Sequence, residues 1–175
     1  GSEAIRELLD PEVVAEVERS LQRLTEDRRP RHAEDTADLL RFLGDLSDAE
    51  ALERGVPREW LDELVAQRRA IRVRIAGEER TIAIEDAGRV RDALGVALPV
   101  GVPEAFTEPV ADPLGDLVSR YARTHGPFAA TEPATRFGLG VAVVTAVLDR
   151  MAATGRLVRG ELRPGNQQHV GLGRG

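Results

Sequence analysis

The chain has 175 residues, a formal net charge of −6 and no cysteine, and only 3% of its residues are aromatic. The absence of cysteine excludes disulfides, thiolate metal sites and thiol catalysis, and no apolar run reaches the ~20 residues that a membrane-spanning helix needs. No signal-peptide pattern opens the sequence, so we expect a cytoplasmic protein with one domain or two small ones built from aliphatic side chains.

The charges are unevenly distributed along the chain. Residues 1–112 carry 16 Arg and 26 acidic residues, residues 113–175 carry 8 Arg and 4 acidic residues, and Lys is absent throughout. A basic module behind an acidic one can concentrate phosphate contacts at one end. Chance segregation over these small counts is the alternative.

The first part of the chain predicts an N-terminal helical segment (1–32) followed by a compact unit (33–95). In that unit, one helix stops at Gly44, a second begins at a capping box of Ser47 and Glu50, and a third has Pro57 as its first residue. The alternating stretches IRVRI and TIAI then predict a β-hairpin, and a short helix follows at 87–94. Helix, helix, helix and hairpin is the order of a winged helix-turn-helix.

The second part of the chain repeats this order. A Pro-rich stretch (96–112) predicts a linker or an ordered crossing, and residues 113–165 then form the second unit. We expect a first helix, a short second helix capped by Thr131, and a third helix with an apolar stripe that ends at Gly155. A basic wing strand follows, and residues 166–175 show no pattern and predict an irregular tail.

These elements together predict a mainly α fold with small β-hairpins (α+β): tandem winged helix-turn-helix domains preceded by the N-terminal helical segment. In such domains the third helix enters the major groove of DNA and the wing contacts flanking phosphates.

The second unit supplies the candidate nucleic-acid contacts. Its third helix offers few polar side chains among alanines, and only Arg150 suits base recognition, so contact with the sugar–phosphate backbone is the stronger expectation. A solvated or protein-facing surface stays open as the alternative. The candidate contact residues are Arg120, Arg123, Arg136, Thr145, Arg150, Arg156, Arg159 and Arg163.

No catalytic or metal site emerges from the residue pattern. The histidines (His32, His125 and His169) stand far apart in the sequence and are expected to be surface or loop residues. A P-loop requires lysine, which the chain lacks, and there is no nucleophile-elbow motif. The third helix of the first unit carries acidic side chains that would repel phosphates, so we expect it to have a structural role or to contact protein.

Three long stretches resemble the large helicase-related (Lhr) family of bacterial superfamily 2 ATP-dependent DNA helicases. They are LLDPEVVAEVERSLQRL, AGEERTIAIEDAGRVRDALGVALP and DPLGDLVSRYARTHGPFAATEPATRFGLGVAVVTAVLDRMAATGRLVRGELRPG, which cover most of residues 6–165. The resemblance is to part of the long C-terminal region that follows the helicase core. The chain departs from the family pattern at the Pro of 131–134 and after Gly165.

The resemblance implies a string of winged helices with a β-barrel, similar to winged-helix DNA glycosylases, in a parent enzyme that moves 3′ to 5′ on single-stranded DNA. It also implies that ATP and Mg²⁺ belong to the helicase core, so no cofactor and no catalytic residue are expected in this fragment. The implied partners are DNA, as a single strand or a hybrid duplex, and other domains of the helicase. A homo-oligomer is possible, and no membrane is implied.

Two other functions compete with this expectation of a non-catalytic, nucleic-acid-binding fragment. One is a protein-interaction or oligomerisation module of the same helicase, which the acidic first unit favours. The other is a winged-helix transcription regulator, against which the weak base-reading face and the lack of a dimerisation segment count.

Overall fold

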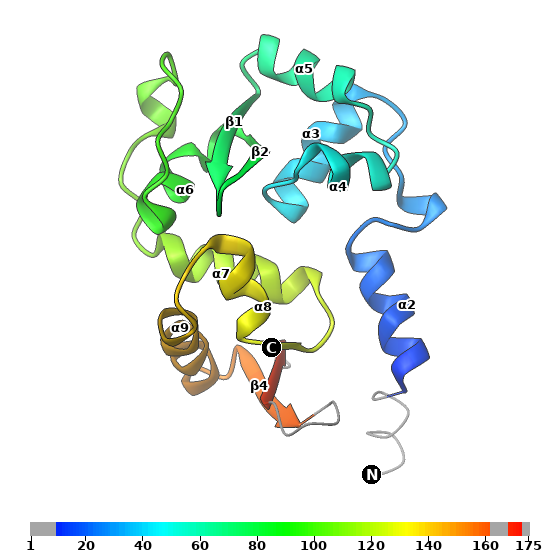
Figure 1. Cartoon of the computed structure of the whole chain (residues 1–175), viewed down its shortest axis with the longest axis vertical. Coiled ribbons are helices and arrows are strands. Elements are labelled where there is room, and N and C mark those ends of the chain that lie inside the picture. Colours follow the sequence, from blue (N-terminus) through cyan, green and yellow to red (C-terminus); the bar gives the residue numbers. More distant parts are fainter. Residues whose placement is uncertain (1–9, 162–167, 173–175) are drawn as a thin grey trace.

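The computed structural model describes residues 10–161 and 168–172, with only the backbone described from residue 158 onward. The fold is mainly helical with a β-hairpin, as predicted (Figure 1). Among the described residues, no helix combines the length and apolar character needed to cross a bilayer.

The first half of the chain forms the elements expected of a winged helix. These are α2 (Pro11–Leu21), α3 (Ala33–Leu43), α4 (Asp48–Glu53), α5 (Arg58–Ala66), β1 (Ala70–Ile75), β2 (Glu78–Ala83) and α6 (Ala87–Leu94). The predicted capping box is confirmed: the Ser47 hydroxyl accepts from the Glu50 N–H, and the Glu50 carboxylate accepts from the Ser47 N–H. Pro57 is the N-cap of α5 rather than its first helical residue.

The second half of the chain has the order helix, short strand, helix, helix, hairpin. Its elements are α7 (Pro113–Thr124), β3 (Phe128–Ala129), α8 (Thr131–Phe137), α9 (Val141–Ala153), β4 (Leu157–Glu161) and β5 (Gln168–Leu172). Thr131 is the first helical residue of α8 and Ala130 is its N-cap, so the prediction that Thr131 caps this helix is wrong.

Residues 166–175 are not an irregular tail throughout, because 168–172 form strand β5. This strand lies between β3 and β4 and pairs antiparallel with both. Its sequence, QHVGL, has little strand character of its own. The backbone hydrogen bonds offered by β3 and β4 therefore supply what its residue pattern lacks.

The β1–β2 hairpin lies between the helices of the two halves and contributes to both cores (Figure 1). Ile71, Val73 and Ile82 belong to the cluster that contains the buried residues of α7, α8 and α9. On the opposite face, Ala70 and Ala83 pack with α3, α4 and α5. Each half therefore completes its core with the same hairpin.

The Pro-rich stretch 96–112 is an ordered crossing rather than a free linker. Leu98, Val102 and Phe106 pack against the shared core, and the Thr107 carbonyl accepts from Arg91 Nη2 at 2.7 Å. A Cβ on Gly88 would lie 2.9 Å from two carbonyl oxygens of this stretch, so glycine permits the close approach.

Candidate nucleic-acid interface

Arg120, one of the predicted contact residues, lies inside the molecule. Its Nη1 donates to the buried Asp86 carboxylate at 2.8 Å, and its side chain is 11% exposed. The guanidinium also lies over Gly44, where a Cβ would come within 2.8 Å of Nη2. To reach a phosphate, Arg120 would have to leave a buried carboxylate, which is costly.

Arg136, another predicted contact residue, joins the second half of the chain to the first. It donates to both Glu50 carboxylate oxygens, at 2.6 and 3.1 Å, and to the Asp45 carbonyl at 2.5 Å. Burial alone raises the pKa of Glu50, but the hydrogen bond and the charge of Arg136 outweigh burial and lower the pKa to about 2. Arg136 is held by carboxylates from two directions and does not face open solvent.

A second arginine completes this buried network. Arg80 donates to Asp45 Oδ2 at 2.9 Å and to the Arg136 carbonyl at 2.7 Å, and the Arg80 and Asp45 side chains are 7% and 6% exposed. Internal partners thus occupy Arg120 and Arg136, so neither is retained in the interface proposed below.

Arg123 and Arg156 occupy a different setting, at a cleft between the two halves of the chain. Arg123 Nη1 and Arg156 Nη2 both lie within hydrogen-bond distance of Ser119 Oγ, at 3.5 and 3.2 Å. Among the described residues, neither guanidinium has a carboxylate partner. Both side chains belong to exposed residues, so both cations remain accessible.

Thr145 and Arg150 lie on α9, the third helix of the second half. Arg150 is exposed and donates to the Asp112 carboxylate at 3.1 Å, a surface pair that water weakens. Thr145 is half-buried, and its exposed neighbours on the helix include Val141 and Val143. This helix offers little that could read base edges.

The structure does not describe the side chains of the two remaining predicted contact residues, Arg159 and Arg163. Arg159 lies in β4, where its backbone pairs with Val170. Arg163 falls outside the described residues.

The cleft also contains functional candidates that the sequence analysis did not select. Ser119, Arg41 and Arg89 line it together with Arg123 and Arg156. The spacing of Ser119 and Arg123, four residues apart on one helix, was a usable signal for this pair. Arg41 and Arg89 come from the acidic half of the chain, and no local pattern places them beside α7.

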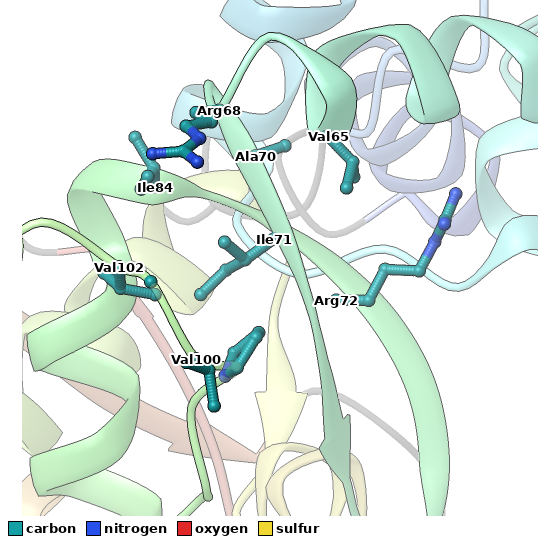
Figure 2. A pocket seen from close by; sticks show the side chains of 10 residues that line it. Val65, Arg68, Ala70, Ile71, Arg72, Ile84, Val100 and Val102 are labelled. Carbon is teal, nitrogen blue, oxygen red and sulfur yellow. The ribbon is translucent and has the colours of Figure 1, made fainter.

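A second hollow is apolar and lies beside β1. It has a volume of about 400 Å³, with Ile71 and Ala70 of the strand on one side and Val100 and Val102 on the other (Figure 2). Val100 is fully exposed. Arg68 and Arg72 also line the hollow, and in this view Arg72 projects away from Val100.

The described residues include no cluster of titratable groups suited to a metal ion. No group of three or more His, Cys, Asp or Glu side chains in the described ranges could hold a metal ion. His125 lies in the loop that follows α7, as one of the two expected settings allows, and is half-buried there: its ring stacks on Tyr121 at 3.6 Å, and its Nδ1 donates to the Tyr121 carbonyl. Burial lowers the pKa of His125, which favours the neutral imidazole.

The sequence of the chain is similar to those of known helicases. Residues 7–109 match the family model described as "Large helicase-related protein, winged-helix domain". The chain is 54% identical over 164 residues to "Lhr helicase/ probable uracil glycosylase" of Mycolicibacterium smegmatis, covering 92% of this chain and 11% of that protein. It is 41% identical over 154 residues to "Lhr helicase/uracil glycosylase" of Escherichia coli, covering 85% of this chain and 10% of that protein. The chain thus spans about a tenth of the length of these curated relatives.

Proposed function

The chain belongs to the large helicase-related family and contains its winged-helix domain, and we propose that it is a non-catalytic part of such a helicase that holds the nucleic-acid backbone. In this proposal residues 113–161 and 168–172 belong to a second winged helix, whose order of helices and strands matches that of the first unit with the short strand β3 added. ATP binding and hydrolysis belong to other parts of the parent protein, since the chain spans only about a tenth of its relatives.

The proposal rests on those exposed arginines of the second half that form no internal ion pair with a buried carboxylate. Arg123 and Arg156 have no carboxylate partner among the described residues, and Arg150 has one exposed partner. Arginine binds phosphate oxygens through a planar fork of donors. Because α9 offers little for base readout, binding is independent of base sequence.

Fluorescence anisotropy with single-stranded DNA, duplex DNA and an RNA–DNA hybrid tests this function. Three arginine–phosphate contacts predict that log K falls with log salt concentration at a slope of about −2 on a single strand. Salt-insensitive binding, or none at micromolar protein, would remove the proposal.

A second candidate function, contact with another protein surface, is favoured by the apolar groove beside β1. Val100 is fully exposed there, and Val141 and Val143 are exposed on α9. Light scattering discriminates the two functions: a stable oligomer without affinity for nucleic acid favours protein contact. A Val100→Ser variant that dissociates such an oligomer assigns the contact to the groove.

A further inference from the structure

We infer that the cleft between the two halves is a binding site for one phosphate group of a nucleic-acid strand, held by Arg123, Arg156 and Ser119. This inference rests on the proposed nucleic-acid function and goes further, because it assigns a discrete site. The cleft has a volume of about 620 Å³, and residues from both halves line it.

Among the described residues, the charges that line the cleft leave two cations without a counter-ion. Five arginines and three carboxylates surround it. The carboxylates are already engaged: Glu85 lies 4.0 Å from Arg41, Asp86 accepts from Arg89 and Arg120, and Asp116 accepts from Arg89. Arg123 and Arg156 are the remaining two arginines.

The only acceptor that the described residues offer these two guanidiniums is the Ser119 hydroxyl. A hydroxyl is neutral and leaves both positive charges uncompensated. A phosphate group can accept hydrogen bonds from both guanidiniums at once, and charge-assisted bonds of this kind are stronger than those to a neutral oxygen. The Ser119 hydroxyl can then donate to the same phosphate.

Local backbone structure places the three residues near one another before any ligand arrives. Ser119 and Arg123 stand one turn apart on α7. Arg156 follows a Schellman motif that closes α9, in which Gly155 N–H donates to Ala152 O and Arg156 N–H donates to Met151 O, each at 3.0 Å. Gly155 has φ +76°, which glycine adopts without strain.

The residues that line the cleft favour binding of a phosphate group over binding of a whole nucleotide. No aromatic side chain is among the described residues that line the cleft, so these residues offer a base no surface on which to stack. The site therefore reads the backbone of a strand and is indifferent to its bases. Because Arg41 and Arg89 approach from the first half, a strand held here lies at the junction of both halves.

Removing the two cations tests the site on the 175-residue chain, with fluorescein-labelled oligo-dT as the probe. The double variant Arg123→Gln/Arg156→Gln is expected to weaken binding about tenfold or more and to make the salt slope shallower by about 1.4. The matched control is Arg68→Gln/Arg74→Gln, which removes two arginines that are also exposed and have no carboxylate partner among the described residues. An equal loss in both variants would mean a general charge effect and would overturn the site.

The substitution Ser119→Asp keeps both arginines and places a carboxylate between them. We expect it to lower oligo-dT affinity as far as the double variant does, with an unchanged thermal midpoint by circular dichroism, because the internal carboxylate competes with phosphate. Unchanged affinity in this variant would contradict the proposed site.

Titration with inorganic phosphate separates failure of the site from failure of the proposed function. If the site binds phosphate, the Nε–Hε NMR signals of Arg123 and Arg156 should shift with added phosphate until the site is saturated. In the Ser119→Asp variant these signals should not shift. If the protein binds phosphate but not oligo-dT, the anion site is supported and the nucleic-acid function is contradicted. Oligo-dT binding that leaves both signals unmoved would keep the function and reject the site.

Discussion

Arg136 is one of the two arginines, with Arg120, through which the second half of the chain pairs with buried or half-buried carboxylates of the first. Replacing it in Arg136→Met leaves Glu50, whose side chain is 27% exposed, without its arginine partner, and leaves the 6% exposed Asp45 with Arg80 alone. Removal of one partner from a buried pair is strongly destabilising, and we expect the free energy of unfolding to fall by about 2–4 kcal/mol. Urea unfolding followed by circular dichroism at pH 7 measures this change.

The same ion pair makes the stability of the protein dependent on pH in the acid range. Since the folded-state pKa of Glu50 is lowered from 4.5 to about 2, its stabilising contribution is complete above pH 4.5 and is lost as the pH falls toward 2. The stability difference between wild type and Arg136→Met should narrow over that interval. An exposed control, Arg58→Met, should change the unfolding midpoint little, and a difference that stays constant with pH would contradict the assignment.

The candidate site could be predicted only in part, because a sequence identifies arginines but not their partners. Arg123 and Arg156 were selected and lie at an accessible cleft. Arg120 and Arg136 were selected on the same grounds, yet Asp86, Asp45 and Glu50 reach them from positions 34 to 91 residues away. No local pattern reports such a distant carboxylate.

The β1–β2 hairpin is the element on which both cores depend. Ile75 is 1% exposed and lies in the cluster that contains Phe137 of the second half. We expect Ile75→Ala to lower the free energy of unfolding by about 3 kcal/mol through the lost burial and the cavity left behind. Hydrogen exchange should quicken in α7 as well as in the hairpin. The exposed Leu52→Ala serves as control, and faster exchange confined to the hairpin would contradict a shared core.

The helices and this hairpin were predictable because each carries a local signal. The capping box at Ser47, the short helix at 87–94 and the alternation of IRVRI all produced the expected elements. The partner of the hairpin was not predictable: alternation indicates an apolar face but does not say which helices cover it. The strand at 168–172 was missed because its stability comes from its neighbours rather than from its own residues.

At the scale of the whole molecule, the segregation of charge has a structural role in addition to any role with nucleic acid. The acidic first half supplies Asp45, Glu50 and Asp86, and the basic second half supplies the Arg120 and Arg136 that pair with them. The two halves are therefore electrostatically complementary. Part of the uneven charge is neutralised by ion pairs between the two halves, and only the arginines outside these pairs are available to an external anion.

Shared apolar packing and shared ion pairs together predict that the two halves unfold as one cooperative unit. Trp60, the single tryptophan, packs against the first core and reports its unfolding by fluorescence. Amide hydrogen exchange in α7 and α9 reports the second core. We expect both probes to give the same midpoint in urea, because loss of the hairpin removes part of each core at once. Separate midpoints would show that each half is stable without the other, and would contradict the single unit inferred from the hairpin.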